Sequence, residues 1–315
     1  MVNGLSLNQR TFARSKTLPL EKSLRRNDKS HVCELISVSY EPEENYPPLV
    51  YENTWSKETL SIDRENELFV ALILILFGSG GYLMGLPYLM ELSGSPGFYL
   101  GGLMLSTLIN VAILAVMVFL GLRLGQLVGL GAPILNADLN GESVLDKLKE
   151  IFKFAPILGV ISGALVFMLD VYVFSPLLSP TTPPIVPSLG SRVLAILYGG
   201  IYEELFLRLF ILTAVVWFIW KLKQREDGTP YPLTYWIGLI LSALVFGLMH
   251  LSTAGLVMEI TPIIIARAII LNGIPGFIFG WLYWKQGIES AIVAHIFADL
   301  MIHVVLQQIF LAMVV

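Results

Sequence analysis

Apolar residues form seven long runs in the chain after residue 67, and each run is long enough to cross a bilayer as a helix. Before residue 67, no apolar run reaches that length. The expected spans are approximately Leu68–Met90, Phe98–Leu122, Phe154–Phe174, Val193–Trp220, Leu233–Leu251, Pro262–Trp284 and Ile288–Val315. The pattern predicts an all-α fold, a polytopic transmembrane helix bundle of about seven spans with an extramembrane N-terminal tail.

This change of pattern divides the chain into two regions. We expect residues 1–66 to be a polar N-terminal tail, cytoplasmic and partly disordered, and residues 67–315 to be the transmembrane helical domain. The first thirty residues of the tail are basic, so this end of the tail could contact anionic lipid headgroups.

Three local patterns modify the simple picture of seven rods. The first run contains Gly78-Ser79-Gly80-Gly81 and Pro87, which weaken a helix interior, so two shorter helices are an alternative to one span. Charges spaced along Asn136–Lys153 predict an amphipathic surface helix that leads into the third span. Five prolines predict an irregular outer loop from Ser175 to Ser191.

Lys and Arg residues are distributed unevenly between the two sides of these spans. With the N-terminus inside, seventeen of the twenty lie in inside segments, while only Arg192 lies in an outside loop. Cytoplasmic loops are enriched in these residues, so we expect a cytoplasmic N-terminus and an outside C-terminus. We expect a multi-pass protein of the cell membrane, with an organellar membrane as the alternative.

Composition agrees with a membrane protein and excludes several other classes. The chain is 55% hydrophobic and 14% charged, with a mean hydropathy of +0.73. A net charge of -4 and the lack of a basic module argue against a nucleic-acid partner. Because Cys33 is the only cysteine, an intrachain disulfide or thiolate metal cluster is excluded.

Ionisable residues inside the apolar runs are the informative ones for function. Each costs about 2.5 to 3.5 kcal/mol or more near the bilayer centre, so each needs a partner or a function. They are Asp170, Glu203, Glu204, Arg208, His250, Arg267, His295, Asp299 and His303.

The fourth run contains two adjacent acids that differ in the partners available to them. Glu204 and Arg208 are four residues apart in the favourable order for an ion pair on one helix face. Glu203 points about 100° away and has no such partner in its own helix. It is a candidate proton acceptor, or it pairs with Arg267 or with a histidine on a neighbouring helix.

Three of the four histidines lie in or beside hydrocarbon. His250 ends the fifth run, and His295 and Asp299 lie one helical turn apart in the seventh. Together with the acid pair they indicate one polar centre built from three helices. We expect His303 to be a packed residue. Small residues at Gly199, Gly200, Gly276 and Gly280 predict close helix packing.

Glu203-Glu204-x-x-x-Arg208, Phe246-x-x-x-His250 and His295-x-x-x-Asp299, in this order, resemble the CAAX protease and bacteriocin-processing family of intramembrane proteases, also called the abortive-infection family. The resemblance covers roughly residues 195–300. It implies an endopeptidase in which Glu203 and His250 activate a water and His295 with Asp299 stabilises the oxyanion. Glu204 and Arg208 would orient the site.

Two roles stay open within this resemblance. Prenyl-protein members carry Asn where this chain has Asp299. A carboxylate donates no hydrogen bond, so the alternatives for Asp299 are to fix the tautomer of His295 or to ligate a metal. Glu203, His250 and His295 are the candidate Zn²⁺ ligands. The His-Glu-x-x-His motif is absent and the resemblance implies a metal-free mechanism, so we expect no obligatory cofactor, with Zn²⁺ as the alternative.

The expected partners are the lipid bilayer and a membrane-associated protein or peptide substrate, with prenylated proteins among the candidates. A different reading is a non-proteolytic scaffold, immunity factor or chaperone of the same family. A further one is a proton-coupled transporter with Asp170, Glu203, Glu204 and Asp299 as a relay. The lack of a visible inverted repeat argues against the transporter.

Overall fold

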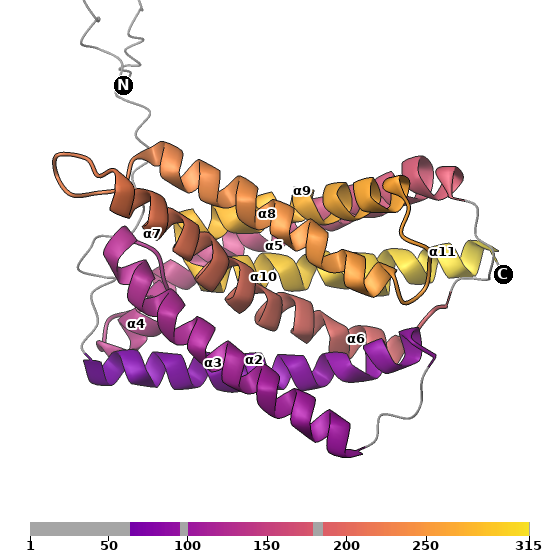
Figure 1. The fold of residues 1–315 in the computed structure, drawn as a ribbon, viewed down its shortest axis with the longest axis horizontal. Helices are drawn as coiled ribbons and strands as arrows, with labels where there is room; N and C mark the ends of the chain where they lie inside the picture. The colour runs from indigo at the N-terminus through magenta and orange to yellow at the C-terminus, as the bar shows by residue number, and fades with distance from the viewer. Residues whose placement is uncertain (1–63, 95–99, 179–184, 315) are drawn as a thin grey trace, which may run out of the picture. The chain divides into compact units, whose positions relative to one another are not determined.

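The structure, a computed structural model, describes residues 64–94, 100–178 and 185–314 (Figure 1). Within these ranges the chain is helical and contains no strand. Nearly all of the predicted N-terminal tail, residues 1–63, lies outside the described residues, as do residues 179–184 of the predicted outer loop.

Among the described residues, seven helical segments are long and apolar enough to span a membrane, which confirms the all-α class and agrees with the predicted number of spans. They are Asn66–Leu92, Gly102–Val128, Leu145–Leu177, Leu189–Leu222, Pro232–Ala254, Pro262–Gln286 and Ile288–Met313. The third and fourth begin several residues earlier than the apolar pattern predicts, because polar first turns extend the helices beyond their apolar stretches.

Four of the spans are single helices, and a short helix precedes the third span. These helices are α2 (Arg64–Leu92), α3 (Leu100–Val128), α4 (Pro133–Leu139), α8 (Pro232–Ala254) and α9 (Pro262–Gln286).

The other three spans change helix type along their length. The third is α5 (Leu145–Leu169), the π-helix η1 (Asp170–Phe174) and the 3₁₀ turn η2 (Ser175–Leu177). The fourth is α6 (Leu189–Leu197), the π-helices η3 (Tyr198–Glu203) and η4 (Leu205–Leu212), and α7 (Thr213–Leu222). The seventh is α10 (Ile288–Asp299), the π-helix η5 (Leu300–Leu306) and α11 (Gln307–Val314).

The first span is one continuous helix, so the alternative of two shorter pieces is wrong. Its glycines serve close packing instead of a break: a Cβ on Gly81 would lie 2.6 Å from the Leu197 carbonyl oxygen, and one on Gly85 2.7 Å from the Tyr198 side chain. A helix broken in hydrocarbon would leave backbone groups without partners, which favours continuity despite Pro87.

The amphipathic helix predicted over Asn136–Lys153 is also wrong. The chain breaks between α4 and α5, and Gly141 there has a φ of +72°, which favours glycine and ends the helix. Asn136 is buried in α4, whereas the predicted amphipathic charges Lys149 and Lys153 lie on the first turns of α5.

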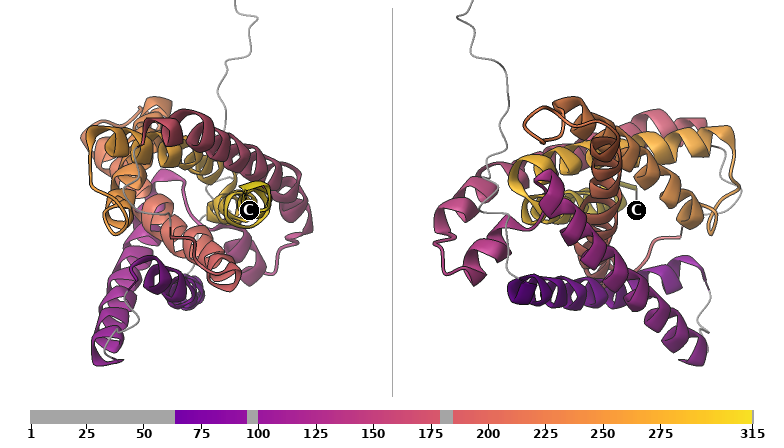
Figure 2. Two further views of the ribbon diagram at one scale, coloured as in Figure 1. Left: turned by 90° about the vertical axis from the view of Figure 1, so that its right-hand side faces the viewer. Right: turned by 60° about the vertical axis from the view of Figure 1, so that its left-hand side comes forward.

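Helix α10 is deeply packed because it presents small residues to its neighbours. It lies against α5, α9 and η3, and the colours in Figure 2 show its yellow segment among these helices. Ala294 and Ala298 are almost fully buried, and a Cβ added to Gly163 of α5 would lie 2.6 Å from the Ala298 carbonyl oxygen. This close approach brings His295 and Asp299 into the interior.

Candidate active site

Four acidic residues of the spans lie in or next to π-helical segments. Asp170 begins η1, Glu203 ends η3, Glu204 precedes η4, and Asp299 precedes η5. π-Helical turns are rare and frequently occur at functional sites, because an extra residue in a turn redirects the side chains around it. Local helix geometry therefore helps to aim these carboxylates.

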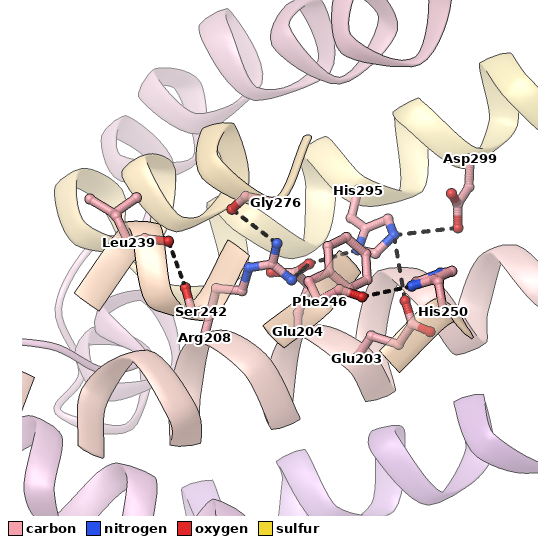
Figure 3. Close-up of polar contacts among 10 residues, drawn as sticks. All are labelled: Glu203, Glu204, Arg208, Leu239, Ser242, Phe246, His250, Gly276, His295 and Asp299. Carbon is pink, nitrogen blue, oxygen red and sulfur yellow. Dashed lines mark hydrogen bonds and ion pairs between the residues drawn. The ribbon is translucent and has the colours of Figure 1, made fainter. Parts of the chain in front are cut away.

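Glu204 and Arg208 form the ion pair that their spacing predicts. Arg208 Nη1 lies 2.8 Å from Glu204 Oε1, and both side chains are fully buried. Arg208 Nη2 donates to the Gly276 carbonyl oxygen at 3.0 Å (Figure 3). The guanidinium carbon lies 4.8 Å from the ring centre of Phe246 and 5.5 Å from that of Phe279. The buried charge is thus held on several sides.

Glu204 also fixes the imidazole of His295. Its Oε1 lies 2.6 Å from His295 Nδ1, and a carboxylate only accepts, so this nitrogen carries the proton. The ring stacks on Phe279 at 4.7 Å between centres and meets Phe246 edge-on at 5.7 Å. The tautomer of His295 is therefore set by Glu204, and the tautomer-fixing role left open for Asp299 is wrong.

The other nitrogen of His295 faces two acids. Nε2 lies 3.6 Å from Asp299 Oδ2 and 3.9 Å from Glu203 Oε2, distances that are too long for direct hydrogen bonds but suited to a shared water. Gly199 makes this approach available, because a Cβ there would lie against the Asp299 carboxylate and 3.2 Å from His295 Nε2.

Arg267 is not the partner of Glu203. Its Nε and Nη2 donate to Oδ1 and Oδ2 of Asp170, each at 2.6 Å, in a half-buried bidentate pair. The predicted pairing of Glu203 with Arg267 is therefore wrong. Glu203 instead faces His295, a histidine on a neighbouring helix, which was the other alternative. The engagement of Asp170 also argues against its use as a free proton relay.

His250 is oriented by its own helix. Its Nδ1 lies 2.9 Å from the Phe246 carbonyl oxygen, which can only accept, so Nε2 is the acceptor in the neutral ring. Its imidazole meets the Phe246 ring edge-on at 4.8 Å. Figure 3 shows His250 and the Glu203 carboxylate at the same end of the cluster. Phe246 thus contacts Arg208, His250 and His295 together.

The donor set does not fit a metal ion. Over the described ranges, no three His, Cys, Asp or Glu side chains are grouped so that they could hold one. We therefore derive no chemistry from Zn²⁺ at Glu203, His250 and His295.

Several side chains around the cluster were missed from the sequence. Phe279 packs against the rings and charges of the site. It was missed because an aromatic residue in an apolar run does not stand out as a site residue. Tyr202 donates to Asn110 Oδ1 at 3.2 Å, and Asn110 Nδ2 donates to Tyr82 at 3.1 Å, which links α2 and α3 to the residue before Glu203. The signal for this network was a lone asparagine inside the second apolar run.

His303 packs edge-on against Tyr88 at 6.0 Å, as expected of a packed residue.

Fold and site together define a helical membrane protein with a buried centre of glutamates, imidazoles and an arginine. The family model described as Type II CAAX prenyl endopeptidase Rce1-like matches residues 186–301, which include all six candidate residues. The match confirms the family resemblance seen in the motifs over this part of the chain, and the seven apolar helices support a multi-pass integral membrane protein. No curated protein and no solved structure matched the chain.

Proposed function

We propose that this protein is an intramembrane endopeptidase that hydrolyses a peptide bond of a membrane-associated substrate. The supporting observation is the position of His295, with Nδ1 held 2.6 Å from Glu204 and Nε2 facing Glu203 at 3.9 Å in a buried cluster. A carboxylate and an oriented imidazole around one water are the elements that general acid–base hydrolysis requires. The Rce1-like match makes peptide hydrolysis the favoured reaction class.

In the proposed mechanism, Glu203 and His250 activate the water. Glu203 accepts one proton while the water oxygen bonds to the scissile carbonyl carbon, and Nε2 of His250 accepts a hydrogen bond from the second hydrogen. The peptide C–N bond then breaks, and the proton held by Glu203 passes to the departing amine. No metal is needed for this balance of atoms and protons.

His295 is assigned to the negative charge that develops on the carbonyl oxygen. As a cation, the ring donates from Nδ1 to Glu204 and retains an Nε2–H for the oxyanion. Glu204 and Arg208 position the ring, and Asp299, 3.6 Å from Nε2, balances its charge. The low-dielectric surroundings of the cluster strengthen each of these interactions.

The substrate and orientation belong to the same proposal. A prenylated protein is the favoured substrate, since the matching family is described as a prenyl endopeptidase. We place the N-terminus in the cytoplasm and the C-terminus outside, in the cell membrane, on the strength of the Lys and Arg distribution.

The test maps peptide termini created in a membrane proteome by purified wild-type protein and by Glu203→Gln. Wild type is expected to generate new termini, and Glu203→Gln to generate none above background while its unfolding temperature stays near that of wild type. The matched control is Glu226→Gln, which removes an exposed carboxylate between α7 and α8 and should cleave like wild type.

Equal cleavage by wild type and Glu203→Gln would end the proposal. A scaffold or chaperone function predicts a different pattern, in which Glu203→Gln, His250→Ala and His295→Ala lower thermal stability in parallel with function and no new termini form.

A further inference from the structure

Asn110 is a polar residue inside the second membrane span, far in sequence from the cluster described above. Both ends of its side-chain amide are engaged. Oδ1 accepts from the Tyr202 hydroxyl at 3.2 Å, and Nδ2 donates to the Tyr82 hydroxyl at 3.1 Å and to the Ser106 carbonyl oxygen at 2.8 Å. Because an amide in hydrocarbon is costly unless it is paired, Asn110 is a fixed point to which α2 and η3 are both bonded.

Stacked rings add to these hydrogen bonds on one side of η3. Tyr198 and Tyr202 stack at 5.3 Å between ring centres, and the ring of Tyr82 lies 5.5 Å from that of Tyr202 in a tilted arrangement. Helix α2 approaches this side closely, since a Cβ on Gly85 would lie 2.7 Å from the Tyr198 side chain. This side of η3 is therefore anchored both by aromatic packing and by hydrogen bonds.

The adjacent side of η3 faces the candidate active site. Gly199 and Glu203 each directly follow one of the two stacked tyrosines, so they share the next side of the helix. A Cβ on Gly199 would lie 3.2 Å from His295 Nε2, and Glu203 faces the same nitrogen at 3.9 Å (Figure 3). No hydrogen bond that the described structure shows holds the Glu203 carboxylate itself. Its position therefore depends on how η3 is turned about its axis, and the tyrosine side fixes that rotation.

We propose that Asn110 is a positioning residue for Glu203 and acts through Tyr202. This role rests on the proposed function, in which Glu203 is the base. Without the Asn110 anchor, η3 can turn and move the carboxylate from its place beside His295, and a misplacement of about 1 Å can cost about a hundredfold in rate. Asn110 lies before the region that the family model matches, so the second span belongs to the site as well.

The experiment measures kcat and KM of the full-length protein in detergent micelles with an internally quenched S-farnesylated peptide. Tyr202→Phe removes the donor hydroxyl but keeps the ring, and Asn110→Leu removes the acceptor. Each should lower kcat by about tenfold while KM changes by less than about twofold. Because both substitutions break the same hydrogen bond, the double variant should also fall by about tenfold, and not by the roughly hundredfold expected of independent effects.

Tyr172→Phe is the matched control, because it removes the hydroxyl of a tyrosine that is 73% exposed and should leave kcat unchanged. Unfolding temperatures in the same detergent should stay near that of wild type for Tyr202→Phe. The role of Asn110 is overturned if Tyr202→Phe keeps the wild-type kcat, if the losses of the two single variants multiply, or if kcat falls only in proportion to the folded fraction.

This role and the proposed function can fail separately. Cleavage by wild type with an unchanged kcat in Tyr202→Phe would end the role of Asn110 alone. The absence of cleavage by wild type, of this peptide and of the membrane proteome alike, would end the proposed function and this role with it.

Discussion

Glu204 is the residue at which the charges of the site meet. One oxygen, Oε1, lies within 2.8 Å of both Arg208 Nη1 and His295 Nδ1, on different helices. Glu203, directly before it, makes no hydrogen bond that the described structure shows, and the basic group that it faces, His295 Nε2, is 3.9 Å away. The two neighbouring glutamates therefore differ in their contacts: Glu204 joins two helices, whereas Glu203 has no such contact and is available for the proposed chemistry.

This division predicts different stabilities for two equivalent substitutions. Glu204→Gln leaves the buried Arg208 guanidinium without a counter-ion and should destabilise the protein by about 3 to 5 kcal/mol. Glu203→Gln should change stability by only about 1 kcal/mol or less. Unfolding of the two variants and wild type in the same detergent measures both effects. Equal losses of stability would show that Glu204 is no more important to the fold than Glu203.

Gly199 yields a second prediction about a single residue. Gly199→Ala would push a methyl group against Asp299 and His295 Nε2, and a small misplacement of reacting groups costs about a hundredfold in rate. We expect cleavage to fall by about tenfold or more while the protein still inserts. The control is Gly190→Ala on the same helix, where a Cβ meets nothing within 4 Å. Similar cleavage rates for the two variants would refute the spatial requirement.

At the level of helices, the sequence predicts that the spans exist but not which face of each is buried. Length and apolarity suffice for the count because hydrocarbon thickness fixes both. Helix α10 illustrates the limit: the buried face that includes Ala294 and the half-buried face that includes Ile292 are both apolar, so no periodicity separates them. The π-helical turns at Glu203 and Asp299 were also unpredictable, since they depend on packing between helices.

The contact between α5 and α10 can be tested by one methyl group. Gly163→Ala would place a Cβ 2.6 Å from the Ala298 carbonyl oxygen and force the helices apart. Overpacking of this kind costs about 1 to 3 kcal/mol, and it should be seen as a lower unfolding midpoint. Gly80→Ala in α2, where a Cβ meets nothing within 4 Å, should leave the midpoint almost unchanged. A loss no larger than that of Gly80→Ala would mean that the two helices can separate freely.

For the molecule as a whole, the motifs predicted most residues of the candidate site but few of the residues on other helices that surround it. Glu204, Arg208 and His295 meet as the motif spacing suggested, because intramembrane charges have few alternatives to each other. The family match begins at residue 186, yet Tyr82 and Asn110 on the first two spans join the network beside Glu203. A lone asparagine in an apolar run hints at such a network, but one sequence does not show which residues of distant segments it joins.

Orientation in the membrane is a property of the whole chain, and its only cysteine can report it. Lys221 lies at the end of the fourth span, and Lys223 and Arg225 follow it. Four crossings, an even number, put these residues on the same side as the N-terminus, which their positive charge predicts to be the cytoplasmic side. An impermeant maleimide applied to intact cells should therefore leave Cys33 unlabelled until the cells are opened. In a Cys33→Ser background, Met313→Cys at the exposed end of the last span should label without opening. Labelling of Cys33 in intact cells, with Met313→Cys protected, would reverse the topology, and it would mean that Lys and Arg do not set the orientation of this chain.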